Sequence, residues 1–166
     1  DHANNVHGLF VTGGTFTGKD ITVRDVSNVG LRLSGGAATV EKLTVESAGA
    51  DAVWASGGKA TLNNLVVKKA GGAGVSATDT ADVTVTGGSI SNTSSHGVKS
   101  EGEAKLTLKN ISVGIATTAG RHAVLAQGGD VQLENIKVVG VQENTEGSGI
   151  RINRETSHIS GSNIDI

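Results

Sequence analysis

The sequence predicts an all-β protein, a right-handed parallel β-helix of about seven coils, each built from three short strands. Self-similar units follow one another along the chain at intervals of 22 to 26 residues. Within each unit, apolar and polar residues alternate over a few positions, which is the period of a strand with one buried face. Turn-forming Gly and Ser separate these alternations. One unit is too short to bury its own apolar face, so stacked units must share a core.

The first strand of each unit sets the register of the repeat. It opens on a small residue that an apolar residue follows in every copy, and the openings are Gly8, Gly30, Ala52, Gly74, Gly97, Ala123 and Gly149. Parallel stacking of like strands places the apolar positions over one another inside the coil. The predicted interior file contains Leu31, Val53, Val75, Val98 and Val124.

Length and composition fit a single domain over residues 1–166, because the repeat leaves no room for a second fold. The chain has 25 Gly, no Pro, no Cys and 2% aromatic residues, so thin layers of aliphatic side chains must fill the interior. A net charge of -2 gives no reason to expect a nucleic acid or an anionic membrane as partner. No apolar run is long enough to insert into a membrane.

The turns and corners follow in chain order after a lead-in over residues 1–7. Gly pairs before the second strand predict tight bends with positive φ, at Gly13-Gly14, Gly35-Gly36, Gly57-Gly58 and Gly128-Gly129. The third strands are predicted to begin at Ile21, Leu43, Leu65, Ile90, Ile111, Ile136 and Ile164. Asn precedes four of these starts and suits a left-handed corner, at positions Asn64, Asn110, Asn135 and Asn163. On adjacent coils, Asn110 and Asn135 are expected to bond each other through their amides.

Two longer connections, 114–121 and 140–148, follow the third strands of coils five and six. Extra residues in a solenoid form loops on one side, often the side that binds. The chain ends at 164–166 without a capping element, and open strand edges invite pairing. We therefore expect a piece of a longer rod, or end-to-end or side-by-side self-association.

The outward position of the first strand is the candidate ligand-binding surface. Its residues are Phe10, Arg32, Trp54, Ser76, Lys99, Leu125 and Arg151. Arg32 falls between two aromatic residues on neighbouring coils, within reach of Trp54. We predict that this surface binds a carbohydrate or acidic polymer, through Arg32, Trp54, Lys99 and Arg151. The alternative is a ladder of long side chains that only shields the sheet.

The position just before each first strand carries titratable side chains. The column reads His7, Val29, Asp51, Ala73, His96, His122 and Ser148. His96 and His122 are expected one coil apart, but no third ligand is in register, so we predict solvated corner histidines and no metal site. No Asp-x-Asp pair and no EF-hand spacing signals calcium.

Four stretches, 57–62, 70–77, 83–90 and 123–129, resemble the passenger domains of pertactin-like autotransporters, and this resemblance in repeat style covers most of the chain. It implies a rod exported by a Gram-negative bacterium, secreted or held at the cell surface on the outer membrane. It also implies an adhesin or immune-evasion factor that meets a host surface protein or glycan without a cofactor.

Segments 36–45 and 49–53 resemble the small pectate lyases of family 3. Asp51 alone carries over: Ala50 replaces an acidic residue of the family, and 70–73 replaces an Asp-Lys pair. This alternative is a polysaccharide lyase with Ca²⁺ as cofactor, in which Asp51, Lys99 and Arg121 are the residues to test. A third class, a structural or ice-ordering rod, requires a regular Thr array. We do not expect one, because Thr84 and Thr86 do not fall in register with Thr on neighbouring coils.

Overall fold

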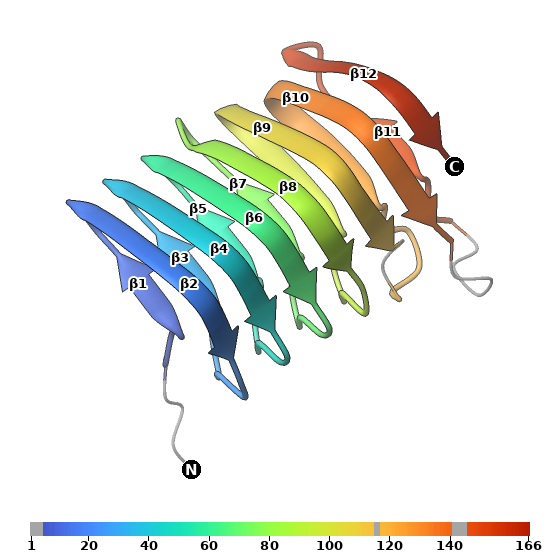
Figure 1. Cartoon of the computed structure of the whole chain (residues 1–166). Coiled ribbons are helices and arrows are strands. Elements are labelled where there is room, and N and C mark those ends of the chain that lie inside the picture. Colours follow the sequence, from blue (N-terminus) through green and yellow to red (C-terminus); the bar gives the residue numbers. More distant parts are fainter. Residues whose placement is uncertain (1–4, 115–116, 141–145) are drawn as a thin grey trace.

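The computed structural model describes residues 5–114, 117–140 and 146–166, and within them every regular element is a strand (Figure 1). Five short strands are β1 (Leu9–Val11), β3 (Leu31–Leu33), β5 (Val53–Ala55), β7 (Val75–Ala77) and β11 (Ile150–Ile152). Five long strands are β2 (Thr15–Val23), β4 (Ala37–Val45), β6 (Lys59–Val67), β8 (Asp82–Ile90) and β12 (Ser157–Asp165). In β9 (Val98–Gly114) and β10 (Val124–Val139) the short and long parts are continuous. None of the described residues belongs to a helix able to cross a membrane.

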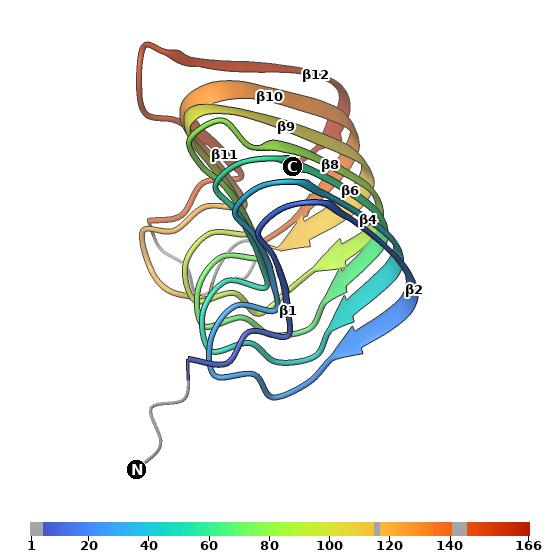
Figure 2. The same cartoon turned by 90° about the vertical axis from the view of Figure 1, so that its left-hand side faces the viewer.

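These strands wind into a parallel β-solenoid of about six complete turns, and β11 and β12 begin a further one. Every strand pairs in parallel with the equivalent strand of the next coil, so the coils lie over one another in the end-on view (Figure 2). Coils β1–β2 and β11–β12 lie at opposite ends of the stack. The all-β solenoid predicted from the repeat is confirmed.

The predicted interior file is also confirmed. Its five side chains are successive parallel partners and are fully buried: Leu31, Val53, Val75, Val98 and Val124. Leu9 and Ile150 extend the file at its two ends. A second buried file, from the long strands, contains Val40, Leu62, Val85, Leu108 and Leu133. Because each layer is thin, the aliphatic side chains of one coil are shielded from water only by the coils on either side.

The second and third predicted strands of each coil are continuous parts of one bent strand. A left-handed residue stands at the bend of each coil, at Asp20, Lys42, Asn64, Gly87, Asn110, Asn135 and Asn163, and in coil four Gly88 also has positive φ. The amide nitrogen of Asn135 donates to the side-chain oxygen of Asn110 at 2.8 Å, as predicted. Asn163 donates to Asn135 in turn at 2.9 Å, so the last three corners share one ladder.

The predicted corner of coil four is wrong. Ile90 does not open the third segment there, because Gly87 takes the left-handed corner with φ 77° and Gly88 pairs with Leu65. Ile90 pairs with Val67, two positions further along. Gly tolerates positive φ at no steric cost, so it replaces Asn at this bend.

The Gly-pair turns behave as predicted. The second Gly of each pair has positive φ, as in Gly14 (71°), Gly36 (72°), Gly58 (73°) and Gly129 (72°). In the first three coils the bend directly precedes the long strand, whereas Gly128 and Gly129 lie inside the continuous strand β10.

The expectation that Thr84 lacks Thr partners in register is wrong. Thr84 pairs with Thr61 on one side and Thr107 on the other, whereas Thr86 pairs with Asn63 and Lys109. The prediction failed because residues of neighbouring coils pair according to their distance from the corner residue. Thr84 precedes the Gly87 corner by the same three positions that separate Thr61 from the Asn64 corner.

The two longer connections are only partly described. Residues 115–116 and 141–145 of the predicted loops lie outside the described part of the chain. The prediction that these loops form a binding side therefore stays a prediction.

Candidate ligand-binding face

The outward side chains of the short strands form the file that the repeat predicts, here called the first-strand face. Successive parallel partners are Phe10, Arg32, Trp54, Ser76, Lys99, Leu125 and Arg151. Ser76 and Leu125 are buried between longer neighbours. Cationic and aromatic side chains therefore make up the accessible part of the face.

Arg32 is held between two aromatic rings. Its guanidinium carbon lies 4.8 Å from the ring centroid of Phe10 and 4.9 Å from that of Trp54. One ring comes from the coil before and one from the coil after, because β3 pairs with both β1 and β5. Cation–π contact on both sides favours one orientation of the planar group. Phe10 remains 48% exposed, so this stack has an open edge.

The guanidinium of Arg32 has no carboxylate partner in the described part of the chain. Its Nη1 donates to His7 Nε2 at 3.0 Å, since a guanidinium can only donate. Burial, and then the charge of Arg32, lower the pKa of His7, which keeps its ring neutral and able to accept. The Nε of Arg32 is buried and makes no hydrogen bond to any residue that the structure describes. The positive charge is thus fixed in place without being neutralised.

A shallow hollow of about 250 Å³ lies beside this stack. Arg32 and Trp54 line it, together with the polar residues His7, Asn28 and Asp51. The hollow therefore combines an aromatic ring, a fixed cation and hydrogen-bonding groups, the combination found where proteins hold sugars and small anions.

The Asp51 side chain is tied to the backbone of the next coil. Its Oδ1 accepts a hydrogen bond from the Ala73 N–H at 2.6 Å. Burial raises the pKa of the Asp51 carboxyl above its ordinary value, against the opposing effects of the Ala73 hydrogen bond and the charge of Lys99. Asp51 is therefore first a corner residue that satisfies a backbone donor.

His96 and His122 are not solvated corner residues, so that prediction is wrong. They are 5% and 3% exposed, and their rings stack with centroids 5.3 Å apart. His96 Nδ1 accepts the N–H of His122 at 3.1 Å, and His122 Nδ1 accepts the N–H of Ser148 at 3.0 Å. Each imidazole satisfies a backbone donor of the following coil, as Asp51 does. This use explains why polar side chains occupy a buried column.

The other predicted cations lie further along the same file. Lys99 forms an ion pair with Glu101 at 3.3 Å, and Arg151 Nε donates to Asn153 at 2.7 Å. Among the residues suggested for a lyase, Lys99 lies near enough to Asp51 for its charge to act on that carboxyl. Arg121 instead acts on His96 and His122.

Sequence reasoning missed His7 as a member of the site. It placed this residue in the lead-in and in the corner column, without the contact to Arg32. The register pairs Arg32 with Phe10, and His7 stands three positions before Phe10, so no register relation in the sequence signals the contact. No group of three His, Cys, Asp or Glu side chains gathers for a metal ion among the described residues.

One family model matches residues 7–166, and it describes a right-handed β-helix region. The match covers every described coil. No curated protein and no solved structure matches the chain.

Proposed function

Since the chain belongs to the right-handed β-helix family, we propose that it is a non-enzymatic recognition module whose first-strand face binds an acidic glycan. The module acts in adhesion or host interaction, on a bacterial cell surface or in the secreted fraction. The similarity of its repeats to autotransporter passengers supports this setting. The partner is a host glycan or a glycosylated surface protein.

The observation that carries the proposal is the Arg32 stack. A guanidinium is fixed between Phe10 and Trp54, is not neutralised by any described carboxylate, and borders a hollow. Such a group binds a carboxylate or sulfate with little loss of side-chain entropy, because its orientation is already set. The exposed part of the rings offers a sugar an apolar surface for stacking.

The remaining cations extend the face along the axis of the solenoid. Lys99 and Arg151 lie on the same file as Arg32, each separated from the next cation by at least one coil. Like strands are about 4.8 Å apart, so the positive groups recur at multiples of this step. A linear polyanion matches such a row better than a compact anion. Lys99 contributes less than Arg32, because Glu101 already pairs with it.

The test is calorimetric titration with hexagalacturonate, a linear acidic oligosaccharide. Trp54→Ala and Arg32→Ala are each expected to weaken binding about tenfold, as for central aromatic and Arg contacts. Arg154→Ala removes one charge from the turn between β11 and β12 and serves as the control, with unchanged binding expected. Equal weakening by Arg32→Ala and Arg154→Ala, with unchanged binding in Trp54→Ala, would show attraction by net charge alone and would sink the proposal.

The lyase alternative is favoured by one feature, the charge of Lys99, which opposes the rise in the pKa of the half-buried Asp51 carboxyl. The same oligosaccharide with Ca²⁺ tests it, through the ultraviolet absorbance of an unsaturated product. Asp51→Asn keeps an oxygen to accept the Ala73 N–H but removes the charge. Product formation that disappears in this variant would make the chain an enzyme.

A further inference from the structure

A second file of polar side chains runs along the outer face of the long strands. Five threonines are successive parallel partners, and a glutamine and a serine continue the row: Thr17, Thr39, Thr61, Thr84, Thr107, Gln132 and Ser160. We call this row the polar file. Its strands lie side by side across the whole stack (Figure 1), and neighbouring members are about 4.8 Å apart.

The hydrogen-bonding groups of the polar file are unused. All seven side chains are at least partly exposed, and none of them makes a hydrogen bond or an ion pair with the described residues. Asp51, His96 and His122 of the corner column differ, because each accepts a hydrogen bond from the backbone of the next coil. The polar file therefore offers donors and acceptors at a regular step along the axis.

The charged residues on both sides of the polar file neutralise one another. On one side, Lys19 pairs with Glu41 at 3.6 Å and Lys109 with Glu134 at 2.8 Å. On the other side, Lys59 pairs with Asp82 at 3.6 Å. The pairs hold the local charge near zero, whereas the first-strand face presents unneutralised Arg32.

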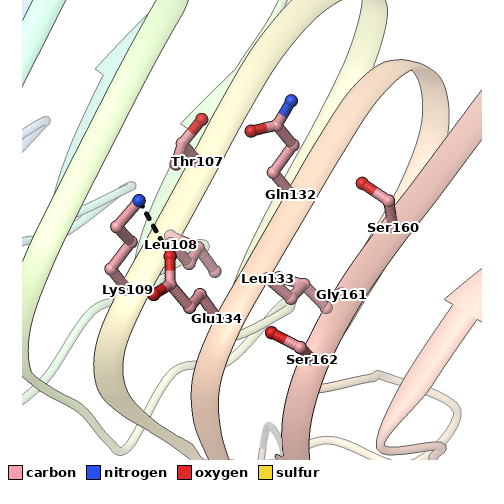
Figure 3. Close-up of a pocket in the computed structure, with 9 residues that line it drawn as sticks. All are labelled: Thr107, Leu108, Lys109, Gln132, Leu133, Glu134, Ser160, Gly161 and Ser162. Carbon is pink, nitrogen blue, oxygen red and sulfur yellow. Dashed lines mark ion pairs between the residues drawn. The ribbon is translucent and has the colours of Figure 1, made fainter.

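Two hollows adjoin the polar file at its C-terminal half. One, of about 170 Å³, lies between β9, β10 and β12, where Thr107, Gln132 and Ser160 project in a row and the Lys109–Glu134 pair forms an edge (Figure 3). The other, of about 190 Å³, is lined by charged residues together with Thr107 and Gln132. Because these two side chains line both hollows, a chain molecule lying along the file has room for substituents on each side.

We propose that the polar file binds a neutral linear glycan whose chain follows the axis of the solenoid. Hydroxyl and amide side chains match sugar hydroxyls in donor and acceptor capacity. The recurring step matches a polymer of regular repeat, and the paired charges beside the file leave no excess positive charge to attract a polyanion. Ice is the rival ligand for a threonine row, but the charged side chains on both sides of this row would lose hydration against an uncharged lattice.

Binding of neutral hexasaccharides tests the proposal, with cellohexaose, xylohexaose, chitohexaose and maltohexaose as probes. At least one is expected to bind, and the double variant Thr107→Val, Gln132→Ala is expected to bind it at least tenfold more weakly. Thr44→Val is the matched control, because Thr44 is also an outward Thr of β4 and its partner in β6 is already Val66. Circular dichroism checks that each variant stays folded.

Trp54→Ala separates this inference from the proposed function, and unchanged binding of the neutral hexasaccharide is expected. Failure of all four hexasaccharides to bind the unmodified chain would overturn the inference. So would equal weakening by Thr44→Val, or ice-crystal shaping that the double variant abolishes without any glycan binding.

Discussion

His96 Nδ1 accepts a hydrogen bond from the backbone N–H of His122 at 3.1 Å. The proton of a neutral His96 must then lie on Nε2, and a protonated ring could not accept this bond. Burial, followed by the charges of His122, Arg121 and Lys99, lowers the pKa of His96 from 6.5 to about 4. Burial and the nearby arginines lower the pKa of His122 as well.

Acid should therefore destabilise the later coils. The pKa of His96 is lower in the folded chain than in the unfolded chain, so as the pH falls the unfolded chain binds the proton first. The stability that His96 contributes is therefore complete above pH 6.5 and is lost between pH 6.5 and about 4. The expected slope is at most about 1.4 kcal/mol per pH unit for each histidine. Urea unfolding at several pH values measures it.

His96→Asn is the informative variant for this effect, because its amide oxygen can accept the same N–H but does not titrate. It is expected to flatten the pH dependence in that range. An unchanged slope in both His96→Asn and His122→Asn would contradict the assignment.

Leu62→Ala is expected to destabilise the solenoid by about 2 to 5 kcal/mol, the usual cost of deleting a buried leucine side chain. Leu62 is fully buried between Val40 and Val85, its parallel partners in the two adjacent coils. Because the strands hold these coils in register, neither coil can move alone to fill the cavity that the substitution leaves. Denaturant titration gives the free energy of unfolding. A loss below about 1 kcal/mol would mean that the layers repack.

Gly14→Ala and Gly36→Ala form a matched pair with almost the same backbone, φ 71° and 72°. A Cβ at Gly14 meets none of the described residues within 4 Å, whereas at Gly36 it runs into the Gly14 carbonyl. The first variant should show only the left-handed penalty of about 1 to 2 kcal/mol, and the second should lose clearly more. Thermal unfolding compares them, and equal losses would refute the role of close coil stacking.

Asn135→Asp tests the corner ladder. Aspartate tolerates the left-handed corner, but it lacks the donor that reaches Asn110, while its oxygen can still accept from Asn163. A loss of about 1 kcal/mol is expected at neutral pH. Asn64→Asp is the control, since Asn64 occupies the same corner outside the ladder. Equal losses in the free energy of unfolding for the two variants would show that the ladder does not stabilise the solenoid.

Prediction from the sequence succeeded at positions that require the same type of residue in every coil. Period-2 alternation identified the file from Leu31 to Val124, because only an inward position stays aliphatic in every unit. It failed at Ile90, where Gly87 provides a corner that no Asn marks. It also failed for the Thr84 row, because register depends on the distance to that corner.

By itself, the sequence determined the parallel β-solenoid and the order of side chains along the first-strand face, since both follow from a repeat that stacks in register. Only the tertiary structure decided which polar side chains hydrogen-bond the backbone and which remain available to a ligand. His96 and Asp51 look like surface residues in the sequence, yet each is held by an N–H of the next coil. The physical reason is that burial and hydrogen bonding depend on what the neighbouring coil places above a residue, and a single unit of the repeat does not contain that information.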